Sequence, residues 1–178
     1  MLEQAANVCD QDVTLADNST TEKRYTANGF TTFSANGGGV LEGLLSSCAG
    51  SITYTNGMFN CFPAAAQTAS LTITDDDLLE PVSVVTASSN NDLFNGVKGM
   101  YVDSTNNWQA ADTPIYVSSG SGSYLEADTP SGESTANYQK ILEMQHPFTT
   151  THTASQRLAK ISLHNQRFNN SMSCLVGL

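Results

Sequence analysis

The sequence predicts an α+β fold in which mostly antiparallel strands pack with two main helices. Three observations carry this prediction. Only 13% of the 178 residues are charged, about half the usual share of roughly 25%, so the chain lacks the Glu and Lys that cover a helical bundle. An Asn-Gly pair between two apolar alternations is typical of a β-hairpin. Two other segments, 40–48 and 154–163, space their apolar residues as amphipathic helices do.

The first part of the chain, residues 1–66, is predicted to be a small subdomain of strand, helix and hairpin. Residues 2–9 have the pattern of the last turns of a helix, with apolar residues on one face. Because this helix opens without a cap, we expect the chain to be a segment of a longer protein. Residues 23–33 alternate weakly and predict a strand that ends in two Phe side chains.

The helix that follows is bounded by its own local signals. Ser34 and Asn36 are both suitable N-caps, and Gly50 is a suitable stop. The glycines at 37–39 are interpreted as a flexible turn before the helix, because no Lys follows at a distance suited to phosphate binding. The hairpin occupies residues 52–62.

The second part, residues 67–178, is predicted to be β-rich. In chain order its expected elements are a strand at 71–73, a turn at 74–79, a strand at 82–85, a turn at 89–94, a strand at 97–102, a polar loop at 103–136 and a strand from 138 to 144. A loop of this length in a compact domain is functional, disordered or specialised for contacts.

The last helix and strand close the chain. Thr153 and Gln156 fit a capping box, and Thr151 is a competing start. Residues 171–178 alternate as a buried strand and stop there, which again predicts a piece of a longer protein. The two parts together are expected to form one α+β molecule.

Charge and hydropathy exclude several functions. With 17 acidic against 7 basic residues and a net charge of −10, a surface for duplex nucleic acid is not expected, because affinity for phosphates rests on Lys and Arg. Strongly apolar stretches reach about five residues, against the roughly 18 that span a membrane, so we expect no membrane segment. The first residues lack the basic and apolar regions of a signal peptide.

Motifs for catalysis and metal binding are missing from the sequence. It contains no nucleophile elbow, zinc-binding helix motif or phosphate-binding loop. The acids at 75–77 lack the spacing of a calcium loop and are interpreted as first-turn residues of a helix. His146, His152 and His164 are expected to be surface or capping residues. The four cysteines lack C-x-x-C spacing, so we expect reduced thiols, and we expect no enzymatic activity and no cofactor.

Four residues stand out as possible subunit or partner contacts. Trp108 is the one large aromatic residue in a polar loop, where it either packs under the loop or contacts a partner. Arg157, Lys160 and Arg167 are three of the four bases after residue 136, a region with a single acid. These bases either sit on the acidic body of the same chain or face an acidic surface of a neighbouring chain.

Several blocks of sequence occur in a characteristic order. They are DLFNGVKGMYVD at 92–103, NNWQ at 106–109, HPFTT at 146–150 and ASQRLAKI at 154–161, preceded by AANVCD at 5–10, EKRY at 22–25, the helix near 41–45 and the hairpin around 54–57. In this order the blocks, which span most of the chain, resemble the tail-tip proteins of long-tailed phages, the J-type tip attachment or host-specificity proteins.

The resemblance implies a role in assembly. The matching region of the family belongs to the central baseplate hub, so the chain is expected to adopt tail-hub-like domains. The full-length protein would form a homotrimer that caps the tail tube at the distal end of the virion, after assembly in the host cytoplasm. Its partners would be itself and other tail-tip and tail-tube proteins, and the family's hub has no catalytic residues to carry over.

Two other functions are compatible with parts of the sequence. A receptor- or glycan-binding module would use Trp108 together with the Ser- and Gly-rich segment at 117–137. A cell-wall hydrolase fused to a tail would need a pair of carboxylates across a cleft, and nothing in the sequence pairs its acids.

Overall fold

The computed structural model describes residues 2–16, 18–66, 72–85, 93–117, 139–168 and 171–173, and it confirms the α+β class. In chain order the elements are α1 (Leu2–Cys9), β1 (Asp12–Thr14), β2 (Thr21–Lys23), α2 (Gly37–Ser46), β3 (Ser51–Thr55), β4 (Met58–Phe62), the single 3-10 turn η1 (Asp75–Asp77), β5 (Ser83–Val85), β6 (Gly96–Asp103), β7 (Gln109–Asp112), β8 (Tyr116–Val117), β9 (Ile141–His146), α3 (His152–Phe168) and β10 (Ser171–Ser173).

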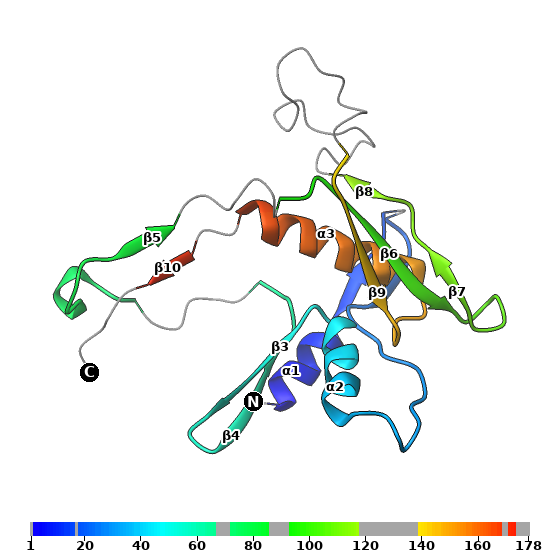
Figure 1. Ribbon diagram of the computed structural model, residues 1–178, viewed down its shortest axis with the longest axis horizontal. Coiled ribbons are helices and arrows are strands. Elements are labelled where there is room, and N and C mark those ends of the chain that lie inside the picture. The colour runs from blue at the N-terminus through cyan, green and yellow to red at the C-terminus, as the bar shows by residue number, and fades with distance from the viewer. Residues whose placement is uncertain are drawn as a thin grey trace, which may run out of the picture.

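The largest sheet is built around β6, with α3 across one of its faces (Figure 1). Along one edge β6 pairs antiparallel with β7 and β8, and it pairs in parallel with β9. Alternate residues of β6 face the helix, and Val97 forms a buried cluster with Ala159 and Leu163 of α3. Of the predicted apolar residues of the last helix, Ala159 and Leu163 therefore cover the sheet, whereas Leu158 packs against Tyr25 and Cys48.

The hairpin β3–β4 forms as the sequence predicts. Its strands pair in register from Ser51 opposite Phe62 to Thr55 opposite Met58. The turn residues Asn56 and Gly57 have φ values of 53° and 78°. Asn and Gly tolerate this left-handed region better than other residues, which is why the pair specifies the turn.

Helix α2 begins with the cap that the sequence predicts. The Asn36 side chain accepts a hydrogen bond from Gly38 N at 3.0 Å. The three glycines at 37–39 form the first helical turn, so their interpretation as a flexible turn before the helix is wrong. A side-chain cap satisfies an amide that the first turn leaves without a helical partner, and this helps glycines to stay helical.

Residues from both parts of the chain share one core. Tyr25 and Cys48 cluster with Leu158 of α3, and Tyr25 also donates a hydrogen bond to Ala64 O at 2.6 Å. The ring of Phe148 lies so close to Gly29 and Gly43 that a Cβ at either glycine would come within 2.8 Å of it. These contacts hold α2 and its preceding loop against the segment that joins β9 to α3.

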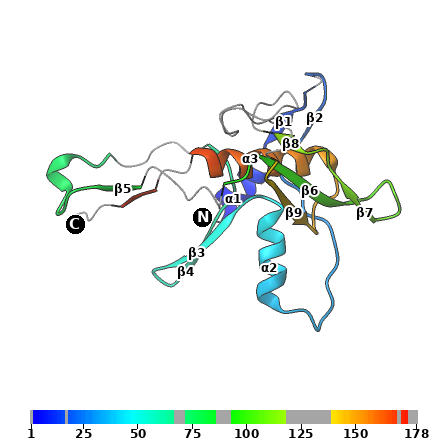
Figure 2. The same cartoon turned by 45° about the horizontal axis from the view of Figure 1, so that its top comes forward.

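The ribbon of β5 and β10 lies apart from these elements in both views (Figures 1 and 2). The two strands pair antiparallel from Ser83 opposite Ser173 to Val85 opposite Ser171, which confirms the predicted strand at 82–85. Before it, Asp77 accepts hydrogen bonds from the backbone N and hydroxyl of Thr74, both under 3.0 Å.

Within the described residues, no helix combines the length and the apolar character needed to span a membrane.

Three predicted segments differ from the structure. The strand expected at 23–33 is limited to β2, which ends at Lys23, and residues 25–32 lie outside any strand. Ile73 is also outside any strand, whereas Leu71 lies outside the described residues. The loop expected at 103–136 contains β7 and β8. The sequence Gln-Ala-Ala-Asp of β7 has no apolar alternation, and it is the pairing with β6 that makes it a strand.

Other predictions fall on residues that are not described. These are residues 89–92 of the predicted turn, the part of the long loop from 118 to 136, Tyr138 and the end of the last strand at 174–178. Helix α3 begins at His152, directly after Thr151, so the predicted capping box at Thr153 and Gln156 lies inside the helix and the competing start at Thr151 is the one that the structure has.

Candidate interaction surface

Trp108 sits at the tip of the β6–β7 hairpin, held by a dense set of local hydrogen bonds. Asp103 Oδ1 accepts from both the backbone N and the hydroxyl of Thr105, at 2.8 and 2.7 Å. Asp103 O also accepts from Trp108 N at 3.0 Å. This turn places Asn107 and Trp108 at φ values of 52° and 59°.

The Trp108 side chain remains 59% exposed, so it does not pack under the loop. A left-handed backbone is strained for a bulky residue, because its Cβ crowds the neighbouring carbonyl. An exposed Trp at a strained position gains little for the fold of its own chain. Of the two interpretations of this residue, contact with a partner is the one that the geometry favours.

Arg157 is engaged within its own chain. Its guanidinium forms an ion pair with Glu22 of β2 and donates to Arg24 O at 2.8 Å. The other Glu22 oxygen accepts from the Thr153 hydroxyl at 2.8 Å. The Arg157 and Glu22 side chains are only 24% and 22% exposed. For Arg157, this ion pair agrees with the interpretation in which the basic helix lies on the acidic body of the same chain.

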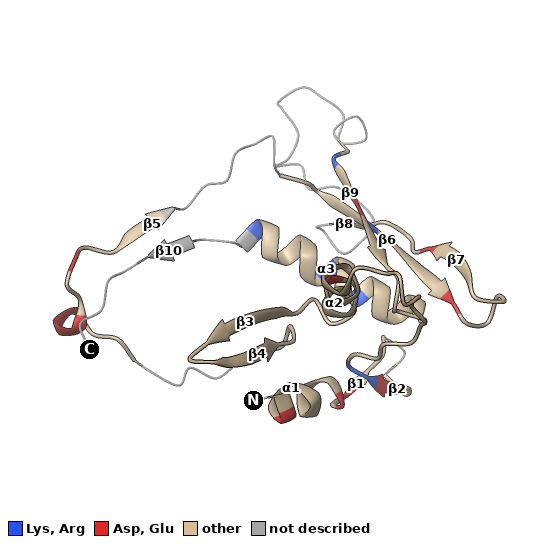
Figure 3. Ribbon diagram, turned by 60° about the horizontal axis from the view of Figure 1, so that its bottom comes forward, with Lys and Arg blue, Asp and Glu red and all other residues tan. Residues whose placement is uncertain are grey.

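The other two bases of α3 lie elsewhere on the helix. Lys160 is exposed, one turn after the Arg157 ion pair, and Arg167 is half-buried in the last turn. Figure 3 shows basic positions in blue on α3, on a ribbon that carries few charges overall. Of the three candidates, Lys160 is therefore the one whose side chain stands out from the surface.

Large apolar side chains are exposed on three neighbouring segments, and sequence analysis did not single them out. They belong to the hairpin β3–β4, the loop before α2 and α2 itself, which extend from the lower part of the molecule in Figure 2. We call them the apolar set: Tyr54, Met58, Phe59, Phe62, Phe30, Phe33, Leu41 and Leu44. Tyr54 and Phe59 contact each other across the hairpin, with ring centroids 4.8 Å apart.

The exposure of the apolar set is high for a free surface. Phe30 is 91% exposed, and Tyr54 and Phe59 are each more than 60% exposed. Soluble monomers seldom keep large apolar groups together in water, and such patches mark sites of interaction. The sequence contains a signal of this exposure, because Met58 and Phe59 are consecutive apolar residues of one strand. Successive residues of a strand point to opposite faces, so the hairpin has apolar side chains on both faces. It cannot bury both faces against one core.

A buried polar cluster lies between the sheet and α3. His146 is 1% exposed, so the expectation of a surface or capping position is wrong for this residue. Neither ring nitrogen has a hydrogen-bond partner among the described residues, and the same holds for the hydroxyls of Thr149 and Ser155. Burial lowers the pKa of His146 below its usual value. A ring enclosed in this way is out of reach of an external substrate.

Trp108 and the apolar set are exposed on different elements. No family model matches the chain, and a search of curated proteins finds no match either. Among the described residues, the exposed side chains include Trp108, Lys160 and the eight of the apolar set. Groups of this kind provide contact area, and apolar and aromatic residues are enriched where protein interfaces are fully buried.

Proposed function

We propose that this chain is a structural component of the tail tip of a long-tailed phage, where it forms part of the central hub that caps the tail tube. Two lines of support meet in this proposal. The order of the sequence blocks resembles the hub region of the J-type tail-tip proteins. The exposure of the apolar set is the observation that carries the assembly role, because a hub subunit buries such groups against its neighbours.

In the full-length protein we propose a homotrimer at the distal end of the virion's tail. The contacts of a ring are heterologous, so one patch of each copy meets a different patch on the next. The apolar set and the exposed base Lys160 belong to different elements, as two such patches would. Further partners would be other tail-tip and tail-tube proteins.

Imaging of the intact tail tests the proposal most directly. Density with threefold symmetry for this chain at the distal end of the tube is the expected result. A position along the side of the tail, or its absence from purified virions, would overturn it.

A pair of variants tests the role of the apolar set. The double change Tyr54→Thr and Phe59→Thr should leave the fold intact, because both side chains are exposed, and should prevent incorporation into tails. Glu42→Gln, an exposed polar change on α2, is the matched control and should incorporate normally. Normal tails from the double variant would count against a buried role for the hairpin face.

The exposed Trp108 supports a second candidate function, a receptor- or glycan-binding module. The experiment that separates the two compares Trp108→Gly with the parent protein. If tails assemble but no longer adsorb to cells or glycans, the binding module is correct. If assembly itself fails while the chain still folds, Trp108 is a subunit contact and the hub proposal gains.

A further inference from the structure

Three free thiols gather where α1, the end of α2 and β4 meet. Cys9 is the last residue of α1, Cys48 follows α2, and Cys61 lies on β4. Cys9 packs against the buried cluster that contains Cys48. Each of the three thiols contributes to the electrostatic surroundings of at least one other, so they share one neighbourhood.

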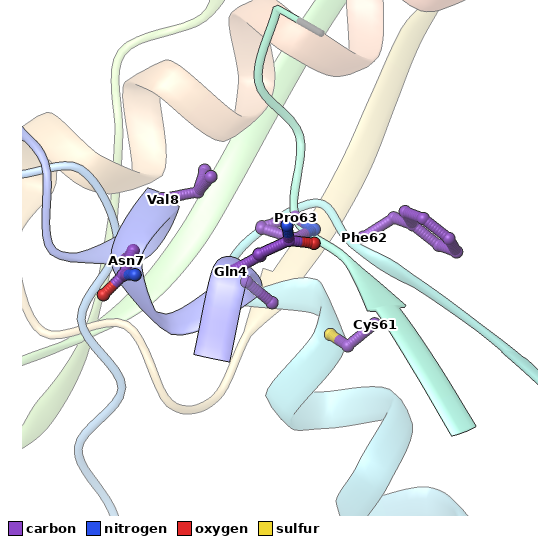
Figure 4. A pocket seen from close by; sticks show the side chains of 7 residues that line it. Gln4, Asn7, Val8, Cys61, Phe62 and Pro63 are labelled. Atoms are coloured by element: carbon purple, nitrogen blue, oxygen red, sulfur yellow. The ribbon is translucent and has the colours of Figure 1, made fainter. Parts of the chain in front are cut away.

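Cys61 faces α1 across a hollow of about 370 Å³. The hollow is lined on the helix side by Gln4, Ala5 and Val8, and Figure 4 shows the Cys61 sulfur directed from β4 towards these residues. Cys9 lies four residues after Ala5 on α1, and positions four apart lie on the same face of a helix. Cys9 and Cys61 are therefore placed on facing surfaces of two elements.

The electrostatics agree with this placement. Burial raises the pKa of the Cys9 thiol, and the next largest cause is Cys61, which exceeds even Asp10, the neighbour of Cys9 in sequence. A like charge exerts such an effect only at short range. Cys61 thus belongs to the electrostatic surroundings of Cys9.

Cys48 is a poorer reactant than the other two. It is buried, its Sγ donates to Leu45 O at 3.3 Å, and burial raises its pKa to about 11. Since the thiolate is the nucleophile, a thiol with such a pKa reacts slowly near neutral pH. Within the described residues, no group of three or more His, Cys, Asp or Glu side chains is placed to hold a metal ion.

We propose that Cys61 is a modification site for low-molecular-weight disulfides and that Cys9 resolves the product, which leaves a Cys9–Cys61 disulfide between β4 and α1. In the first step the Cys61 thiolate attacks the disulfide, forms a mixed disulfide and releases one thiolate. In the second step the Cys9 thiolate attacks the Cys61 sulfur and releases the second thiolate. Two protein thiols are oxidised and one small disulfide is reduced to two thiols. This inference does not depend on the proposed function.

The disulfide would anchor a helix that has little support of its own. Helix α1 is eight residues long and Ala5 is its one buried residue, and helices this short are marginal in water. The bond would close a loop of about 50 residues and restrict the unfolded chain. We expect the oxidised protein to have a melting temperature about 5–10 °C above that of the reduced protein.

The test treats the reduced, folded chain with oxidised glutathione and maps the products by mass spectrometry without reduction. We expect a glutathione adduct on Cys61 that gives way to the Cys9–Cys61 disulfide, together with the rise in melting temperature. Cys9→Ser should retain the Cys61 adduct, Cys61→Ser should form neither product, and Cys48→Ala should behave as the parent does. Circular dichroism of each variant establishes that it is folded.

Two results would overturn the proposal. One is a main product that joins Cys48 or Cys174 to another cysteine. The other is a folded chain whose Cys9 and Cys61 stay reduced until denaturant is added.

Discussion

At the scale of single residues, the sheet and α3 approach each other closely at Gly99. A Cβ built at this position would lie 2.4 Å from Ser155 Oγ and 3.1 Å from Thr113 Oγ1. Gly99 also donates through its backbone N to Thr113 Oγ1 at 3.1 Å. The glycine is thus needed for space, which is a different reason from the conformational one that applies at Gly57.

We predict opposite effects for two glycine-to-alanine changes. Gly99→Ala should lower the free energy of unfolding by about 1–3 kcal/mol, because the new methyl group overpacks a buried site. Gly39→Ala in α2 should raise it by about 0.5–1 kcal/mol, because alanine favours the helix and nothing lies within 4 Å of the new Cβ. Denaturant unfolding measures both, and equal effects of the two changes would contradict the packing at Gly99.

A second prediction concerns the pH dependence set by His146. Burial lowers its pKa below the usual 6.5, so the folded state favours the neutral ring. The unfolded chain therefore takes up the proton first as the pH falls through about 6.5, and stability decreases from there down to the lowered pKa of the folded state. Within that window the loss is about 1.4 kcal/mol per pH unit.

Two measurements check this dependence. NMR titration of the His146 ring should give a midpoint below 6.5. Unfolding at several pH values should show a steeper acid loss for the parent than for His146→Gln. A midpoint at or above 6.5 would mean that the ring is not enclosed as described.

At the scale of elements, Arg157 makes the charged contact between β2 and α3, beside the hydrogen bond from the Thr153 hydroxyl to Glu22. Arg157 binds the Glu22 carboxylate and the backbone carbonyl of Arg24, which lie more than 130 residues away in sequence. Because both charged side chains are less than a quarter exposed, loss of one partner leaves the other partly buried without its counter-charge.

We predict that Arg157→Ala lowers the free energy of unfolding by about 2–3 kcal/mol. Arg157→Lys should rescue little of this, because a single ammonium cannot reproduce the planar, several-donor geometry of the guanidinium. Lys160→Ala is the control on the same helix, and as an exposed residue it should change stability by less than about 0.5 kcal/mol. If Arg157→Ala matched this control, the contact would contribute nothing measurable.

At the scale of the whole molecule, the two predicted parts at 1–66 and 67–178 meet through buried contacts. Leu158 is 1% exposed and packs with Tyr25 and Cys48 of the first part. Asn28 N donates to Phe148 O at 2.8 Å across the same boundary. The buried cluster around Tyr25 and Cys48 of the first part is therefore completed by a residue of the second part.

This sharing predicts that residues 1–66 do not fold when expressed alone. Their amides should exchange with solvent at rates close to those of an unfolded chain. In the whole chain, Leu158→Ala should cost about 2–5 kcal/mol and should reduce amide protection around Tyr25 as well as in α3. Slow exchange in the isolated fragment would show an independent domain instead.

The sequence by itself determined the elements whose cause is local. Asn56 and Gly57 specify the hairpin, Asn36 caps α2, and the apolar spacing of α3 identifies residues that the helix buries, because each of these signals acts within a few residues of the chain. The same local reasoning placed Trp108 in a loop, though it left open whether the side chain was covered.

The tertiary structure decided what depends on distant partners. Strand β7 exists because β6 pairs with it, and β9 joins the sheet in parallel through a contact some 45 residues away. His146 is buried in the fold, and Arg157 forms an ion pair with Glu22 of the same chain. From the charge count alone, Arg157 could equally have paired with an acid of another chain. The apolar set is exposed for the same reason, because burial depends on how much of the chain's own surface is available to cover a side chain.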